Sequence, residues 1–332
     1  MAVRTRLALP SVEYSLVDHC NLRCYACDHA SPLLPISFTD VRTFEADLRA
    51  LARVALVDQL YLIGGEPMLH PQLLDFVSIG CDSGLARGVT LVTNGTLLHT
   101  APDALWTLLS GLDVTTYPGV PLRMPPIDIV TKAACHNVRL RLRNRVDFRV
   151  TLLNDPIVDS TLVQTIFDAC RIAHDYHCHS VLNGRYYKCS PAPHLAKRLA
   201  LLSSSRPYAA AESDGVSLHD NPRLRAELEA YLRSGRPLGA CAYCLGTSGR
   251  TVPHHQTNAA ERLHWMTERH DDVTSLLDND KLHPVRQAHP FAPTNARRAG
   301  ERLWQWLQRA LGQSEAHPGS SRTLHGPSSS SP

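Results

Sequence analysis

Three cysteines lie close together near the start of the chain, at Cys20, Cys24 and Cys27. Three and then two residues separate them, so their thiolates can meet on one loop and hold three irons of a [4Fe–4S] cluster, with the fourth iron left open. Two other chemistries fit the same spacing. These are a zinc site in which His29 supplies a further ligand, and three buried thiols without a metal.

Four further cysteines form a second group later in the chain. Ten residues separate Cys178 from Cys189, and two separate Cys241 from Cys244. Each pair can sit at a hairpin or knuckle, which would bring four thiolates together. Between Cys178 and Cys189, Asn183-Gly184 predicts the turn of a hairpin. Without further context this set is typical of a structural zinc site with four cysteine ligands.

The remaining cysteines, Cys81, Cys135 and Cys170, stand alone. A thiol can return a hydrogen atom to a radical, and Cys135, which precedes an arginine-rich strand, is the candidate we retain for that catalytic role. Cys170 follows Ile166 and Phe167 on an apolar helical face, so we expect it in the core.

The elements that must position these groups alternate between short strands and longer helices in the first half of the chain, which favours βα units and a parallel sheet. The first predicted strand leads directly into Cys20, the second ends at Gly64-Gly65, and the third ends at Thr93-Asn94-Gly95. The predicted strands are residues 12–17, 59–63, 88–92, 113–117, 138–143 and 148–153. The predicted helices are residues 44–54, a segment from about 71, and residues 97–109, 161–173, 223–232 and 296–311.

Composition narrows the class of protein. The chain has 332 residues and a net charge of +3, which suits an ordinary soluble protein with a sizeable core and gives no reason to expect a nucleic-acid partner. No stretch approaches the ~20 apolar residues of a membrane span, and the start is too short for a secretory signal. We therefore expect a cytoplasmic protein, and in a reducing compartment 10 cysteines favour metal binding or catalysis over disulfides.

These motifs, in this order and on these elements, resemble the radical S-adenosylmethionine (radical SAM) enzymes. The family's motif is Cys-x3-Cys-x2-Cys with an aromatic after the second cysteine, a position that Tyr25 fills. Its second motif is matched by Gly64-Gly65-Glu66-Pro67, and its third-strand counterpart by Thr93-Asn94-Gly95. The resemblance implies an α/β fold, a partial (β/α) TIM-like barrel with a small cysteine-rich C-terminal extension.

The resemblance also implies roles for these residues. Cys20, Cys24 and Cys27 would bind a [4Fe–4S] cluster, whose open iron is chelated by the amino and carboxylate groups of S-adenosylmethionine. The two glycines would let the backbone approach that ligand, and Glu66 would accept hydrogen bonds from its amino group. Other residues at strand ends would contact the ribose or carboxylate: Thr93, Asn94 and Thr116.

Within this family the second cysteine group is similar to the Twitch extension, a shortened relative of the SPASM domain that holds one auxiliary [4Fe–4S] cluster. Zinc remains the alternative at Cys178, Cys189, Cys241 and Cys244, because both metals accept four thiolates. If four cysteines saturate the cluster, substrate cannot bind it, and an electron-transfer role is more natural.

The resemblance implies cleavage of S-adenosylmethionine to a 5′-deoxyadenosyl radical, which removes a hydrogen atom from a small-molecule substrate. We expect a sugar or aminocyclitol-like substrate and an outcome of dehydrogenation or epimerisation. A ribosomal peptide is the alternative substrate, and a non-catalytic zinc or iron–sulfur scaffold or sensor is the alternative class. The expected partner is an external electron donor such as flavodoxin or ferredoxin. We expect four regions: 1–175 for the barrel, 176–255 for the auxiliary-cluster region, 256–312 for a helical segment and 313–332 for a disordered tail.

Overall fold

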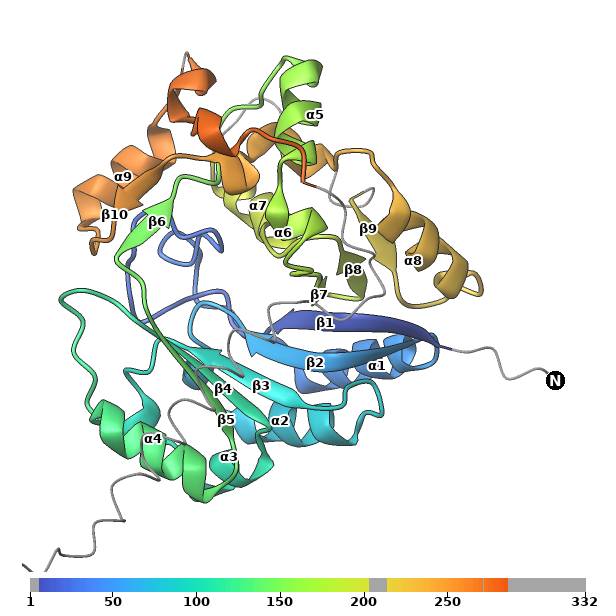
Figure 1. Ribbon diagram of the computed structural model, residues 1–332, viewed down its shortest axis with the longest axis vertical. Coiled ribbons are helices and arrows are strands. Elements are labelled where there is room, and N and C mark those ends of the chain that lie inside the picture. Colours follow the sequence, from blue (N-terminus) through green and yellow to red (C-terminus); the bar gives the residue numbers. More distant parts are fainter. Residues whose placement is uncertain (1–5, 203–213, 271, 286–332) are drawn as a thin grey trace, which may run out of the picture. The chain divides into compact units, whose positions relative to one another are not determined.

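The central feature of the computed structural model, which describes residues 6–202, 214–270 and 272–285, is a mixed sheet (Figure 1). Its strand order is β5-β4-β3-β2-β1-β7-β8-β9. Strands β1 to β5 run parallel to one another, and β7 is parallel to β1. The strands are β1 Leu7–Ser15, β2 Ala55–Ile63, β3 Val89–Thr93, β4 Gly111–Thr116, β5 Arg139–Asn144, β7 Ser180–Leu182, β8 Arg185–Tyr187 and β9 Gly215–Ser217.

Helices connect the parallel strands and lie on one side of them in Figure 1. These helices are α1 Val41–Ala52, α2 Leu73–Asp82, α3 Asp103–Leu108 and α4 Pro126–Cys135. Helix α1 begins where the Asp40 side chain accepts a hydrogen bond of 2.9 Å from the Thr43 N–H, as an N-cap should. The expected α/β fold with a partial (β/α) barrel is confirmed.

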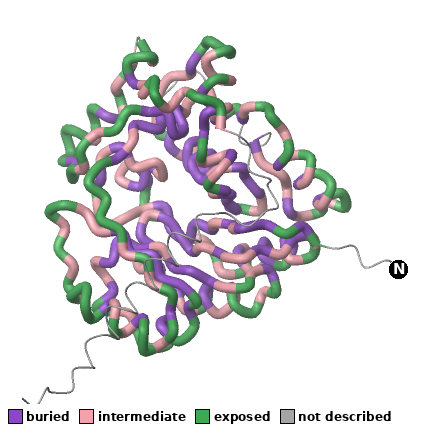
Figure 2. The backbone as a smooth tube through the Cα atoms, viewed as in Figure 1, coloured by how far each residue is buried: buried purple, intermediate pink, exposed green. Residues whose placement is uncertain are grey.

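Alternation along the strands separates the two faces of the sheet. On β1, Val12 and Tyr14 are buried in the core beneath the helices, while Glu13 points to the other side, which we call the inner face. Tyr14 donates a hydrogen bond of 2.7 Å to Asp47 of α1, so the core of this layer also contains a satisfied polar pair. Figure 2 shows the parallel strands largely buried, with exposure at the edge strand β5.

Three predicted elements differ from the structure. The helix predicted over residues 97–109 is interrupted by Pro102, which separates a 3₁₀ turn, Leu98–Thr100, from α3. The helix predicted over residues 161–173 is two helices, α5 Ser160–Asp168 and α6 Arg171–His174. The last predicted strand is only β6, Asp147–Arg149, which pairs antiparallel with β10, Thr251–Pro253, in a sheet of its own.

The cysteine-rich region begins with the β7–β8 hairpin, whose turn is Asn183-Gly184 as predicted. Both residues have positive φ, 49° and 75°, as a type I′ turn requires. The later helices are α7 Pro191–Leu201, α8 Leu224–Arg233, α9 Ala259–Thr267 and the 3₁₀ helices η4 Gly239–Tyr243 and η5 Gly246–Ser248. The predicted helix at 296–311 and the predicted tail lie outside the described residues. None of the helices in the described part is long and apolar enough to cross a membrane.

Candidate active site at the ends of the parallel strands

The loop after β1 gathers the first three cysteines. Burial is the main cause that raises the pKa of the Cys20 and Cys27 thiols to about 12, with smaller contributions from Glu66 at Cys20, from Asp28 at Cys27 and from neighbouring thiols at both. Burial also raises the pKa of Cys24. The Leu22 N–H donates to Cys20 Sγ over 3.3 Å. Three adjacent, largely protonated thiols therefore lie on one loop, and binding a metal there must release their protons.

The glycine turn after β2 packs directly against the strand end that leads to these cysteines. The Gly65 N–H donates to the Val17 carbonyl over 2.9 Å, and the Glu66 N–H donates to the His19 carbonyl over 3.1 Å. A Cβ at Gly64 would lie 2.6 Å from the Val17 oxygen, and one at Gly65 would overlap the His19 carbonyl. The sequence predicts that these glycines make room for a ligand. In the structure, the chain itself occupies that room.

Replacing Gly65 with alanine is therefore expected to disturb the cysteine loop. The new methyl group would force the backbone near His19 to move, at a cost of ~1–3 kcal/mol or more in the free energy of unfolding. Urea unfolding and iron content after reconstitution measure both consequences. Gly235→Ala is the matched control, because nothing lies within 4 Å of a Cβ at that position. Equal stability and equal iron in the two variants would contradict this role of Gly65.

Glu66 joins the second motif to the third. Its buried carboxylate accepts hydrogen bonds from Thr93 Oγ1 over 2.7 Å, from the Asn94 N–H over 2.8 Å and from the Met68 N–H over 3.1 Å. Burial raises the pKa of Glu66 to about 7, although these donors favour the carboxylate. Pro67 follows as the first residue of the 3₁₀ turn Pro67–Leu69. The ends of β2 and β3 are therefore tied together by one carboxylate.

Asn94 links this pair of strand ends to the cysteine loop. Its Nδ2 donates to Asn21 Oδ1 over 2.8 Å and lies 3.7 Å from Cys20 Sγ. Gly95 follows with φ of 76° and donates its N–H to Thr93 Oγ1 over 3.0 Å. The structure thus brings together the three motifs that the sequence analysis singled out.

Two predicted residues do not join this group. Thr116 lies at the end of β4 and donates to the Arg143 carbonyl and to Asn144 Oδ1, both over 3.3 Å, at the exposed edge of the sheet. Cys135 is exposed at the end of α4, which packs through Ile129 and Ala133 on the helix-covered face. Neither position supports the predicted contact with S-adenosylmethionine or the predicted hydrogen-atom donation.

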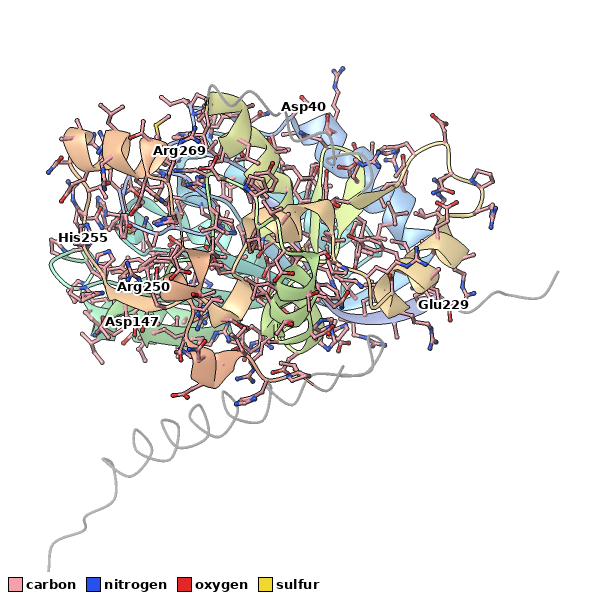
Figure 3. All side chains as sticks on the ribbon, turned by 90° about the horizontal axis from the view of Figure 1, so that it is seen from above. Asp40, Asp147, Glu229, Arg250, His255 and Arg269 are labelled. Carbon is pink, nitrogen blue, oxygen red and sulfur yellow. The ribbon has the colours of Figure 1, made fainter. Side chains whose placement is uncertain are left out.

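A segment far along the chain closes over the cysteine loop, and we call residues 254–257 the clasp. The Tyr25 N–H donates to the His255 carbonyl over 3.1 Å, and the Thr257 N–H donates to the Arg23 carbonyl over 2.8 Å. Tyr25 also stacks on His255, with ring centroids 5.1 Å apart. In Figure 3 His255 lies on the same side of the view as Asp147, whose strand pairs with β10 just before the clasp. Tyr25 therefore helps to anchor the clasp.

The inner face of the sheet carries a row of polar side chains, which we call the polar row: Glu13, Tyr61, Asp113 and Arg141. Neighbouring strands place Glu13 beside Tyr61 and Asp113 beside Arg141, and the last two form an ion pair. All three charged groups influence the pKa of Tyr61, which burial raises. The positive charge of the arginine-rich strand β5 is therefore partly neutralised by Asp113, and Arg141 lies on the inner face.

A second group of thiols lines an apolar pocket to which α5 and α6 also contribute side chains. Its cysteines are Cys170, Cys189, Cys241 and Cys244, with Phe167 and Lys188 among the other lining residues. Burial raises the pKa of all four thiols, to about 12 at Cys244. The three other cysteines raise the pKa of Cys189 further, so the four groups lie near one another.

Cys178, the predicted fourth member, is not among the residues that line this pocket. Burial is the main cause that raises the pKa of Cys178 well above its usual value. The charge of neighbouring Glu13 and a hydrogen bond with the Glu13 side chain raise this pKa as well. Cys189 also influences its pKa, but less. Cys170 is buried, as the sequence analysis expects. That analysis did not group it with the other pocket thiols, because it treats residues 161–173 as one helix. The break between α5 and α6 places Cys170 beside Gly246, where a Cβ would lie 2.8 Å from its Sγ.

Parts of the chain are similar in sequence to known enzymes. No family model matches the chain. GTP 3′,8-cyclase 1 of Mycobacterium tuberculosis is 33% identical over 110 residues, which are 31% of this chain and 30% of that relative. AdoMet-dependent heme synthase of Methanosarcina barkeri is 32% identical over 91 residues, 26% of this chain and 24% of that relative. The matched parts thus span less than a third of these relatives.

Both partial matches agree with the radical SAM resemblance that the three motifs carry. Among solved structures, BtrN in complex with AdoMet and 2-DOIA is matched over 74% of this chain and 96% of that chain, at 15% identity and a TM-score of 0.41. The radical SAM resemblance covers the three motifs at the strand ends. The second thiol group and the polar row lie outside those motifs.

Proposed function

We propose that this chain is a radical SAM enzyme that removes a hydrogen atom from a polar small molecule. The observation that carries the proposal is the convergence of Cys20, Cys24 and Cys27 with the Gly64-Gly65-Glu66 turn and Asn94 at the ends of the parallel strands. Non-catalytic scaffolds need no such junction of three strand ends around free thiols.

We favour a [4Fe–4S] cluster over zinc at the three thiols, because the glycine turn and Asn94 that meet them match the other radical SAM motifs. Within residues 6–202, 214–270 and 272–285, no three His, Cys, Asp or Glu side chains are grouped so that they could hold one metal ion. When bound, the cluster and S-adenosylmethionine would supply the radical that attacks a substrate C–H bond. The chain's own part is to hold the three thiolates and to exclude water around them.

We assign the second cofactor, an auxiliary [4Fe–4S] cluster, to Cys170, Cys189, Cys241 and Cys244. An apolar pocket lined by four buried thiols supports this choice, because burial and full thiolate ligation suit electron transfer. Cys178 is left free by this assignment. An external one-electron donor of the flavodoxin or ferredoxin class would complete the system.

The polar row supports a small substrate rich in hydroxyl or amino groups, such as a sugar or aminocyclitol. Glu13 and Asp113 offer carboxylate acceptors, while Tyr61 and Arg141 offer donors, and all four lie on the inner face below the cysteine loop. The Glu13 carboxyl, whose pKa is raised chiefly by burial, is suited to an alcohol or an amine. Dehydrogenation and epimerisation are both compatible with this site.

Iron and zinc counts after anaerobic reconstitution test the two cofactor assignments together. We expect about eight irons and no zinc in the wild type, and about four irons in a Cys20/Cys24/Cys27→Ala variant. About four irons with one zinc in the wild type would agree with a cluster at the first site and contradict the assignment of a cluster to the second site. A triple variant that keeps all its iron would contradict the first.

A further inference from the structure

Cys24 receives a hydrogen bond from a side chain outside its own loop. Gln256 of the clasp places Nε2 3.2 Å from Cys24 Sγ. This contact joins residues 232 positions apart in the chain. It is also shorter than the 3.7 Å contact that Asn94 makes with Cys20. Of the three thiols of the loop, Cys24 therefore has the closest side-chain amide donor.

The orientation of the Gln256 amide follows from its other partner. The Arg23 N–H lies 2.6 Å from Gln256 Oε1, and a backbone N–H can only donate, so the oxygen must face Arg23. The amino group then faces Cys24. His254 Nε2 lies 3.0 Å from Gln256 Nε2 and 3.3 Å from Cys24 Sγ, so it neighbours both groups. The oxygen and the amino group of the amide therefore both have partners in this one orientation.

The donor is also held in place by the backbone around it. Cys24 and Gln256 face each other in an antiparallel bridge, which the bonds from Tyr25 to His255 and from Thr257 to Arg23 flank. His254 stacks on Tyr117, with ring centroids 4.9 Å apart. Gln256 is exposed, but it meets Cys24 from a backbone segment that these hydrogen bonds hold against the cysteine loop.

We propose that Gln256 raises the reduction potential of the cluster bound at the first site by donating an N–H···S hydrogen bond to Cys24. This rests on the proposed function, since the Cys24 thiolate must be a cluster ligand. Reduction adds one electron from an external donor, and the added negative charge spreads onto the ligand sulfurs. A fixed amide donor stabilises the reduced form more than the oxidised form, and it does so without carrying a charge of its own.

Gln256 is thus a positioning residue. It affects the transfer of an electron to the cluster only through its hydrogen bond to Cys24. The C-terminal part of the chain would thus tune a cofactor whose ligands all lie near the N-terminus.

An EPR-monitored redox titration of the reconstituted full chain tests this proposal. The first cluster is identified as the signal that changes when S-adenosylmethionine is added. Gln256→Met removes the donor at similar length and without a charge change, and we expect its midpoint potential to shift to a more negative value with iron content unchanged. Thr257→Val is the matched control, because it removes the 2.8 Å bond from Thr257 Oγ1 to the Arg23 carbonyl and leaves the amide in place. Its potential should equal that of the wild type.

An unchanged midpoint potential in Gln256→Met would overturn the proposal. An equal shift in Gln256→Met and Thr257→Val would also overturn it, because Gln256 would then only anchor the cysteine loop. If Gln256→Met fails to retain iron, Gln256→Glu decides, because it keeps the acceptor for Arg23 and loses the donor. A potential at or above the wild-type value in Gln256→Glu would then overturn the proposal. A wild type without any signal that responds to S-adenosylmethionine would instead contradict the proposed function itself.

Discussion

Cys170→Ala is expected to strip the second cluster from the reconstituted chain, while Cys178→Ala leaves it bound. Cys170 lines the same pocket as Cys189, Cys241 and Cys244, and its loss leaves one iron without a thiolate. Challenge with a chelator should then reduce the iron content from about eight to about four per chain. Iron analysis and the EPR spectrum before and after the challenge provide the measurement.

Cys178→Ala is the matched control, since it removes another buried thiol from the same region. Cys178 contacts Glu13 of the polar row, and its pKa responds more strongly to that carboxylate than to Cys189. We expect this variant to retain about eight irons after the chelator. The reverse pattern, with iron lost in Cys178→Ala and kept in Cys170→Ala, would restore the ligand set first inferred from the sequence.

Glu66 is expected to make the stability of the metal-free chain fall as pH rises from about 4.5 to 7. The pKa of this carboxyl is 4.5 when exposed and about 7 in the folded chain, where burial raises it. In that window the unfolded chain has released the proton and the folded chain still holds it, so increasing pH favours unfolding. The loss should approach about 3 kcal/mol and level off above pH 7.

Comparison with Glu66→Gln isolates this contribution. The glutamine cannot titrate, and its amino group would face the Asn94 N–H, so the variant carries a cost that does not change with pH. Urea unfolding of both proteins at pH 5, 6, 7 and 8 gives the difference in the free energy of unfolding. A difference that stays constant across this range would show that the Glu66 pKa is not raised.

The sequence predicted the parts of the site that depend on local pattern. Strand ends followed by Cys20, Gly64 and Thr93 could be recognised because parallel strands place their C-terminal ends at one edge. The Asn183-Gly184 turn was predictable for a similar reason, since both residues accept positive φ.

Features that depend on distant contacts could not be predicted. Nothing in the local pattern places Gln256 beside Cys24, because their pairing arises only when the clasp folds back over the cysteine loop. Cys170 was correctly expected to be buried, but its place beside the other pocket thiols could not be predicted, because the apolar spacing of residues 161–173 hides the break between α5 and α6. The role of Gly65 was assigned to ligand approach, although the backbone of His19 fills that space.

The most direct test of the central claim is the formation of 5′-deoxyadenosine from S-adenosylmethionine by the reconstituted chain with dithionite as reductant. The wild type should form it in the absence of any substrate, at a low rate. The Cys20/Cys24/Cys27→Ala variant should form none, while Cys81→Ala, which removes an exposed thiol elsewhere, should match the wild type. Equal 5′-deoxyadenosine from the wild type and the triple variant, or none from a wild type that holds its iron, would contradict the account.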